Sequence, residues 1–327
     1  MQRLTKAGFS KDFVRRAILP DWWDETDADS PGALQEIELR VARFLGAAPS
    51  SLQDHLTVPA YAAAHLRRVR DVSRERLGPS IHAAMRIAEA VSRNLKNSAT
   101  GSAAAPLPAD PLAWRAAVAQ AGKAPTLVAT ARDLWRRGIP VVPVDILPGP
   151  SFQGMACVTA DRPVILLGHK HDEPGRVAFV VAHEAGHIAA GDCQPNAPVI
   201  DEDDEIVDES EMEQRAEAYA MHLLAGASTA PAVDDSRIRD FKELANAAIR
   251  AEREHGAEAS LVIYGWARRT LDYQTATLAV KALYRATGAR RELRDLFVEF
   301  VDIDAASETD RDLLRCVHGV VLHEAAG

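Results

Sequence analysis

The stretch Pro174-Gly175-Arg176-Val177-Ala178-Phe179-Val180-Val181-Ala182-His183-Glu184-Ala185-Gly186-His187-Ile188-Ala189-Ala190-Gly191 decides the predicted fold. Residues 177–182 are all apolar, and the polar residues His183, Glu184 and His187 follow in the same run. Proline is tolerated in the first turn of a helix, and a helix that is apolar on every side is typical of a protein interior. We therefore expect a buried helix from about Gly175 to Ala190. Its two histidines, four residues apart, share one face.

Short apolar runs rich in β-branched residues precede this helix. Three of them follow a predicted helix at 127–137, and they cover residues 139–144, 155–158 and 164–167. Their length and the turn residues between them are typical of β-strands. Because proline cannot donate to a strand ladder, Pro140 and Pro143 predict that the first run lies at the edge of the sheet.

Helical periodicity dominates the rest of the chain. Before residue 97 the predicted helices cover residues 11–18, 34–45, 61–77 and 81–95, the last two separated by Gly78-Pro79. After residue 200 they cover residues 210–224, 240–254, 260–270 and 291–301. The sequence therefore predicts a mostly helical α+β protein, in which a small α/β core with a short mixed sheet is flanked by N- and C-terminal helical regions.

The composition is that of an ordinary globular protein. The chain has 327 residues, of which 47% are hydrophobic, and no run approaches the roughly 18 apolar residues of a membrane span. The N-terminus lacks the pattern of a signal peptide, so we expect a cytoplasmic protein without a membrane partner. Cys157, Cys193 and Cys316 stand far apart without CxxC spacing, which favours neither a disulfide framework nor a cysteine-only zinc site.

The net charge of -9 is unevenly distributed. Residues 67–96 carry eight basic and three acidic side chains, whereas residues 201–213 carry nine acids and no base. The net charge argues against global attraction to nucleic acid, but the basic segment keeps local attraction open. The acidic segment is most often a solvated loop.

The His183–His187 spacing predicts a zinc site. Two imidazoles one helical turn apart can bind a single zinc ion. Glu184, between them, is placed to act as the general base that accepts a proton from a water molecule activated by the metal. Burying three such side chains without partners would cost several kcal/mol, which is a second reason to expect a metal there.

A third zinc ligand is expected from the helix at 210–224. Glu213 and Glu217 lie one turn apart at the border of its apolar face, so we predict Glu213 as the ligand and Glu217 as a partner that orients a ligating histidine. Cys193, just after the first helix, is the competing ligand, although a small loop thiol is the simpler interpretation of it. Two acids that merely solvate a helix flank are the other alternative.

Over about residues 125–226, the chain resembles the ImmA/IrrE family of metallopeptidases. The residues that carry the resemblance are Gly138-Ile139-Pro140-Val141, Val164-Ile165-Leu166-Leu167, the run Phe179 to His187, and Glu213-x-x-Ala216-x-x-Tyr219-Ala220 followed by Leu223-Leu224. The resemblance implies a small α/β metalloprotease core with His183, His187 and Glu213 on zinc. One departure is Glu217, where the family usually has Asn or Asp.

The resemblance also implies a regulatory role, in which such proteins cut or inactivate a helix-turn-helix repressor and release stress or mobile-element genes. Residues 39–52 look like the last helix of an Xre-type helix-turn-helix domain, which makes the N-terminal region a candidate for DNA binding. The expected recognition helix is not evident before them.

These observations predict four segments and one leading function. The segments are an N-terminal helical region at 1–96, a linker at 97–110, a zinc metallopeptidase domain at 111–228 and a C-terminal helical domain at 229–327. The leading function is a zinc-dependent regulatory endopeptidase, with one Zn²⁺ per chain and a specific protein substrate such as a repressor. The alternatives are a non-catalytic metal-dependent binding or sensor protein and a DNA-binding regulator.

Overall fold

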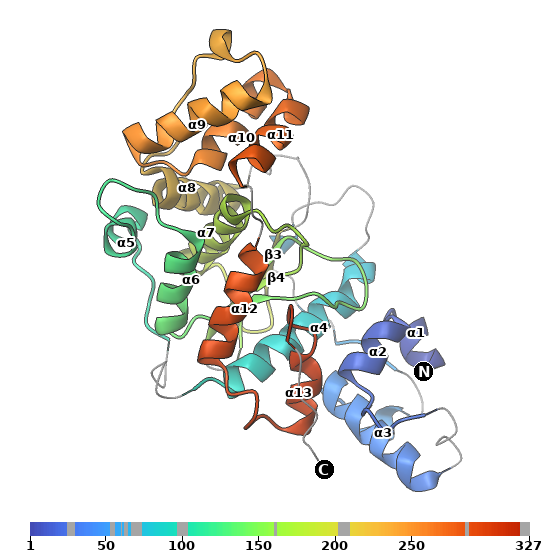
Figure 1. Ribbon diagram of the computed structural model, residues 1–327. Coiled ribbons are helices and arrows are strands. Elements are labelled where there is room, and N and C mark those ends of the chain that lie inside the picture. The colour runs from blue at the N-terminus through green and yellow to red at the C-terminus, as the bar shows by residue number, and fades with distance from the viewer. Residues whose placement is uncertain are drawn as a thin grey trace.

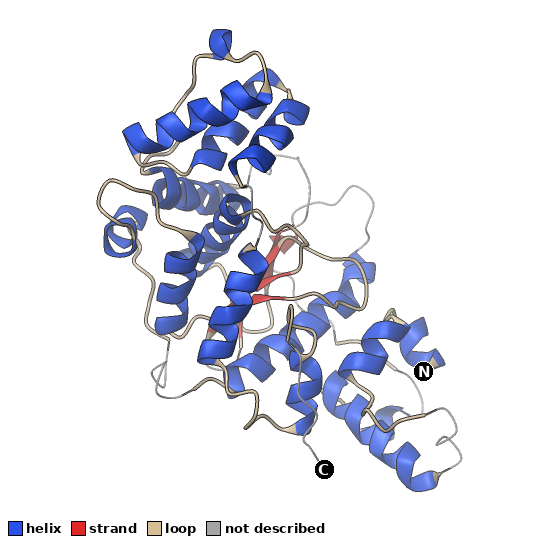
Figure 2. Ribbon diagram, viewed as in Figure 1, coloured by secondary structure: helices blue, strands red, loops and turns tan. Residues whose placement is uncertain are grey.

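A small β-sheet lies at the centre of the molecule and helices surround it (Figures 1 and 2). The computed structural model describes residues 1–24, 30–52, 56–59, 61, 65–66, 74–96, 104–159, 162–201, 210–284 and 288–320. The predicted class, an α+β fold that is mostly helical with a short mixed sheet, is confirmed.

The sheet has five strands in the order β1-β5-β3-β4-β2. They are β1 (His65–Leu66), β2 (Val141–Pro143), β3 (Gly154–Val158), β4 (Pro163–Leu167) and β5 (Val199–Asp201). β3 and β4 form an antiparallel hairpin, β2 lies parallel to β4, and β5 lies antiparallel to β3 and parallel to β1. The three predicted strands are present, and the proline-containing β2 lies at the edge of the sheet as predicted.

Two strands differ from the sequence prediction. β5 was not predicted, and β1 lies inside the segment 61–77 that the periodicity assigns to a helix, so that assignment is wrong at residues 65–66. Both strands are very short and pair with each other across more than 130 residues of sequence. Local periodicity cannot report such a pairing, because the partner is supplied by tertiary structure.

The central helix of the metal-site prediction, α7 (Pro174–Ala190), has the expected bounds. It packs against β3, β4 and α8 (Glu211–Ala225), whose first turn is capped by the Ser210 hydroxyl accepting from the Glu213 N–H. α6 (Leu127–Arg136) packs on α7, and α5 (Pro111–Val118) packs on α8.

A single helix, α4 (Arg74–Arg93), runs through Gly78-Pro79, where a break between two helices was predicted. The predicted break is therefore wrong. Residues 62–64 and 67–73 of the first predicted helix lie outside the described residues. Pro79 is buried within α4 and faces Gly8, and nearly every residue from Ser80 to Val91 is buried. Burial of this length of helix against the sheet outweighs the backbone hydrogen bond that proline removes.

The N-terminal helices share one apolar core with the sheet, α4 to α8, α12 (Ala289–Phe300) and α13 (Glu308–Leu314), and we call it the main core. These N-terminal elements are α1 (Gln2–Lys6), α2 (Lys11–Ala17), α3 (Pro31–Leu45) and the short η2 (Pro49–Leu52). In α12, the Phe300 ring stacks on Trp135 of α6 with ring centroids 5.4 Å apart.

A second core belongs to the three-helix unit, which consists of α9 (Phe241–His255), α10 (Ala259–Thr270) and α11 (Tyr273–Leu283). The short η3 (Asp235–Arg237) precedes it, and Figure 1 shows these helices beyond α8, away from the sheet. The cores thus divide the predicted segment 229–327 between the three-helix unit and the main core. The first part of the predicted linker, 97–103, lies outside the described residues, and Ala105 donates its N–H to the Arg137 carbonyl.

Candidate metal centre

Three buried side chains converge between α7 and α8. His183 and His187 come from α7 and Glu213 comes from α8, and one potential ligand atom from each lies within 4.8 Å of the others. The His183 Nε2 lies 3.1 Å from the His187 Nε2 and 3.1 Å from the Glu213 Oε2, and the His187 Nε2 lies 3.6 Å from the Glu213 Oε1. We call these residues the His-His-Glu triad. These are the three residues that the sequence analysis predicted as metal ligands.

A close approach of α7 to α8 makes this convergence possible. A Cβ atom on Gly186 would lie 3.0 Å from the Ala216 Cα and 3.1 Å from its carbonyl oxygen, so the two helices cross where neither has a large side chain. Glu213 lies one turn before Ala216 on the helix, and His183 and His187 flank Gly186. The glycine therefore allows Glu213 to reach the two histidines across the helix pair.

The triad is electrostatically coupled. Burial raises the pKa of the Glu213 carboxyl, but its hydrogen bonds with His183 and His187 outweigh burial and hold that pKa well below its ordinary value. Burial lowers the pKa of His187, and the contacts with Glu213 and Asp192 more than compensate, so the net shift is upward. Two imidazole nitrogens and a carboxylate this close repel one another unless a proton or a cation lies between them.

The sequence analysis did not identify Asp192, which contacts the triad. α7 ends at Gly191, a residue in the left-handed conformation with φ 75°, and the N–H of Asp192 returns to the His187 carbonyl at 3.0 Å. This helix-terminating turn carries the Asp192 Oδ2 to 3.0 Å from the His187 Nδ1. The glycine followed by an acid after the helix was the available signal.

Glu217, predicted to orient a histidine, does not do so. Its Oε1 accepts a hydrogen bond from the Arg268 Nη1 of α10 at 2.7 Å, and 35% of its side chain is exposed. A position one turn from Glu213 faces in nearly the same direction, but the Glu217 side chain binds the three-helix unit instead of the triad. Asp192 has the contact that was predicted for Glu217.

Glu184, which lies between the two histidines in the sequence, is fully buried. Its carboxylate lies against the backbone of Gly154 on β3. A Cβ atom at residue 154 would overlap the Glu184 carboxylate. Gly154 is therefore a second position that the sequence analysis missed, because its importance comes from a contact between distant segments. The glycine leaves room for this carboxylate between α7 and the sheet.

The competing ligand Cys193 lies apart from the triad. Its side chain is buried in a small apolar cluster with Ala156, Val199 and Met212, and burial raises the pKa of its thiol. Within the described ranges of the chain, the group with metal-ligand geometry is the His-His-Glu triad, and it does not include Cys193. The interpretation of Cys193 as a small buried thiol is favoured. The acidic run at 202–209 lies outside the described residues.

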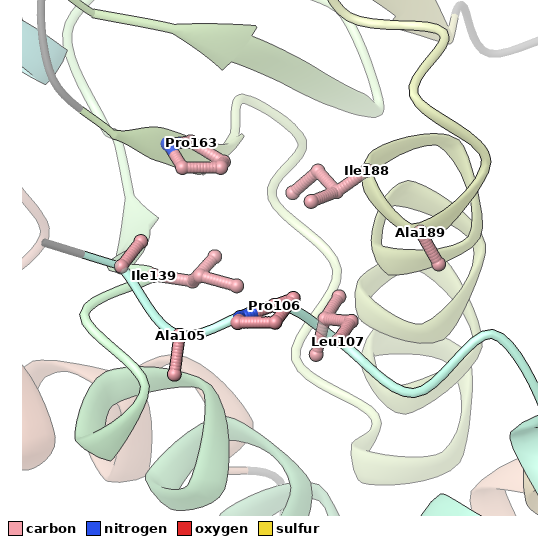
Figure 3. A pocket seen from close by; sticks show the side chains of 8 residues that line it. Ala105, Pro106, Leu107, Ile139, Pro163, Ile188 and Ala189 are labelled. Atoms are coloured by element: carbon pink, nitrogen blue, oxygen red, sulfur yellow. The ribbon is translucent and has the colours of Figure 1, made fainter.

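A pocket lies beside the C-terminal end of α7, at Ile188 and Ala189, rather than at the triad (Figure 3). It has a volume of about 300 Å³ and is lined by Ala104, Ala105, Pro106, Leu107, Ile139, Pro163, Ile188 and Ala189. A larger hollow of about 1010 Å³ lies between α12, α13 and the segment around Trp22. Neither includes a triad residue, so the buried polar cluster, and not a cavity, marks the candidate site.

Arg67, Arg68 and Arg70, at the start of the basic segment 67–96, lie outside the described residues. In the part of the chain that the structure covers, no helix has the length and the apolar character that crossing a membrane requires. Comparison of this chain with protein-family models, with curated proteins and with solved structures gives no match.

Proposed function

We propose that this protein is a zinc-dependent endopeptidase that cleaves a specific protein substrate. The observation that carries the proposal is the convergence of His183, His187 and Glu213, with Glu184 between the two histidines in the same buried helix. The proposal includes one Zn²⁺ per chain, held by the triad.

The donor set fits a catalytic metal better than a structural one. Two imidazole nitrogens and one carboxylate oxygen are the ligands of many catalytic zinc sites, which leave a position for substrate or water. A structural zinc site usually has four protein ligands and is rich in cysteine. Among the described residues, the three cysteines are buried free thiols and none belongs to the group with metal-ligand geometry.

When bound, the metal would supply Lewis-acid chemistry, polarising a peptide carbonyl and lowering the pKa of water. Glu184 is the residue that we assign to proton transfer. Its buried carboxylate can accept a proton from the attacking water and return it to the amine that leaves. Gly154, which has no side chain, would leave room for the Glu184 carboxylate. Asp192 would keep the ring of His187 in place.

The substrate class is proposed from the resemblance to the ImmA/IrrE metallopeptidases. The features that support it are the helix 179–187, the Glu213-x-x-Ala216 spacing on α8, and the close packing of Ala216 on Gly186. We therefore propose a cytoplasmic regulatory protease whose substrate is a transcriptional repressor of the helix-turn-helix type.

The substitution Glu184→Gln tests this function. It replaces the proton-accepting carboxylate by an amide of the same shape, so the purified variant should keep one zinc per chain. Protein N-termini would be profiled by mass spectrometry in cells that produce the wild type or the variant. We expect new N-termini, at least one of them inside a helix-turn-helix repressor, with the wild type alone.

The alternative is a metal-dependent binding or sensor protein that does not turn over a substrate. Identical N-termini in both cell populations, with zinc retained in both proteins, would favour that alternative over the peptidase. His187→Ala serves as the control, since it should lose both zinc and any cleavage. A protein that binds no zinc as wild type would contradict both functions.

A further inference from the structure

We infer that Asp192 and Arg215 form a positioning pair that holds the imidazole of His187 in the tautomer and orientation in which its Nε2 can bind a metal. The inference rests on the proposed function, because it concerns the same metal centre. Neither residue belongs to the predicted ligand set, and neither would touch the metal.

Asp192 is attached to His187 at two points. Its backbone N–H donates to the His187 carbonyl at 3.0 Å, and its Oδ2 lies 3.0 Å from the His187 Nδ1. The Asp192 side chain is only 10% exposed and His187 is fully buried, so solvent screens this contact little. The left-handed residue Gly191 fixes the turn that brings the carboxylate below the ring.

The contact selects one tautomer of His187. A carboxylate oxygen accepts a hydrogen bond, so the Nδ1 that faces Asp192 carries the proton. The Nε2 is then the nitrogen that faces His183 and Glu213, 3.1 Å and 3.6 Å from it, and it can bind a cation that takes the place of a proton between the three groups. Carboxylate partners of this kind orient ligating histidines and make them more basic.

Arg215 fixes the Asp192 carboxylate from the other side. Its Nη2 lies 3.1 Å from the Asp192 Oδ1, so the two carboxylate oxygens bind different partners. Arg215 lies two residues after Glu213 on α8. The helix that supplies the carboxylate of the triad therefore also holds one of the histidines on α7. Arg215 is 56% exposed, so its effect should be the smaller of the two.

The chain offers a matched control in the pair Glu217–Arg268. This pair also joins α8 to a neighbouring segment through an arginine and a carboxylate, with 2.7 Å between the Arg268 Nη1 and the Glu217 Oε1. The Glu217 carboxylate binds Arg268 and not a residue of the triad. Substitution of Glu217 therefore removes the same chemistry without touching the triad.

The experiment measures the zinc affinity of the full-length protein by competition with a chromophoric chelator. We expect Asp192→Ala to weaken zinc binding about 10- to 100-fold and Arg215→Ala about two- to fivefold. Glu217→Ala and Arg268→Ala should remain within twofold of the wild type. The double variant Asp192→Ala/Arg215→Ala should bind no more weakly than Asp192→Ala alone, because Arg215 acts through Asp192.

Asp192→Ala binding zinc as tightly as the wild type would overturn the inference, as would an equal loss in Glu217→Ala. If the losses of zinc affinity add up in the double variant, Arg215 does not act through Asp192 and is not part of the positioning pair. If Asp192→Ala does not fold, Asp192→Asn keeps the size of the side chain and should still weaken binding, since the charge is lost.

A second readout separates this inference from the proposed function. Two-dimensional NMR of the imidazole ¹⁵N nuclei in the metal-free protein reports the tautomer of His187 directly. In the wild type the Nδ1 should carry a proton, and Asp192→Ala should shift the population toward the ring that is protonated only at Nε2. A wild type that binds no zinc would contradict the proposed function, whereas an unchanged tautomer in the variant would contradict the positioning role.

Discussion

The helix pair α7–α8 and the three-helix unit α9–α11 are both built from packed helices, but their interiors differ. Three buried ionisable side chains, His183, His187 and Glu213, lie between α7 and α8, and the buried Glu184 lies on the sheet side of α7. The three-helix unit has a core of aliphatic and alanine side chains around Trp266. Its two buried polar residues, Glu258 and Ser260, lie at its contact with Gly175 of α7. Because burial of charge is costly, the buried ionisable groups of the first interior indicate a functional site. The second interior stabilises the unit by apolar packing.

The largest expected effect separates Glu213 from Glu217, two acids one turn apart on α8. Glu213→Ala should reduce the zinc content from about one per chain to near zero, because it removes one of three ligands. Glu217→Ala should leave the zinc content unchanged. Elemental analysis of both proteins, purified without chelator, provides the measurement. Full zinc content in Glu213→Ala would show that α8 does not complete the site.

Two tryptophans test whether the cores are energetically distinct. Trp266→Ala removes the largest side chain from the core of the three-helix unit and should cost about 3–5 kcal/mol there. Hydrogen exchange should then show loss of protection in α9–α11, with α7 still protected and zinc still bound. Trp135→Ala, the control in the main core, should instead expose amides of α6 and α12. Equal loss of protection in α7 and α9 would mean that the two regions unfold together.

A buried histidine in the main core should make stability depend on pH. The His82 Nε2 lies 2.8 Å from the Phe44 carbonyl, and its Nδ1 lies 2.9 Å from the Tyr61 hydroxyl. A neutral ring satisfies both contacts, because its Nε2–H donates to the carbonyl and its Nδ1 accepts from the hydroxyl. Burial lowers the pKa of His82 from 6.5 to about 4. Protons therefore bind the unfolded chain more readily than the folded one between these values.

The stability contribution of neutral His82 is complete above pH 6.5 and is lost as the pH falls toward 4, by about 3 kcal/mol in total. Urea unfolding from pH 7 to pH 4 measures it. The variant His82→Gln isolates it from other titrating groups, because the difference between wild type and variant should shrink as the pH falls. A difference that stays constant with pH would contradict the assignment.

Two helical glycines give the smallest effects, with opposite signs. Gly186→Ala in α7 forces a Cβ to within 3.0–3.2 Å of Ala216 and Tyr219, and we expect a net destabilisation of about 1–2 kcal/mol with weaker zinc binding. Gly265→Ala in α10 meets its nearest atom at an ordinary 3.6 Å. It should stabilise the protein by about 0.5–1 kcal/mol, because alanine favours helix over glycine. Chemical denaturation of both variants measures the contrast, and a stabilising Gly186→Ala would remove the argument for a close crossing.

Much of the fold could be predicted from local pattern. The bounds of α7, α8, α9 and α10 were predicted to within one or two residues, because the apolar periodicity and the capping residues Ser210 and Asp240 both mark them. The errors at β1 and at Pro79 have a common cause. In both places a long-range partner, β5 or the main core, overrides the local preference of the chain.

The candidate site shows the same division. The residues His183, Glu184 and His187 could be identified from sequence, because one helical turn fixes their spacing and no other part of the fold is needed. Glu213 could be selected through its place at the border of an apolar helix face. The choice between Glu213 and Glu217 as the residue nearest the histidines depends on how α8 is rotated against α7 and on what lies beyond it, here Arg268 of α10.

The sequence by itself determined the helix that carries the two histidines and the glutamate, the class of the fold, and the edge position of the proline-containing strand. Each of these follows from interactions within a few residues of chain. Only the tertiary structure decided that Asp192 contacts His187, that Glu217 binds Arg268, and that Gly154 makes room for Glu184. The last two depend on the distance between segments far apart in the chain, and the first depends on the exact path of the turn after α7. At a polar site an ångström in such a distance decides which groups bond.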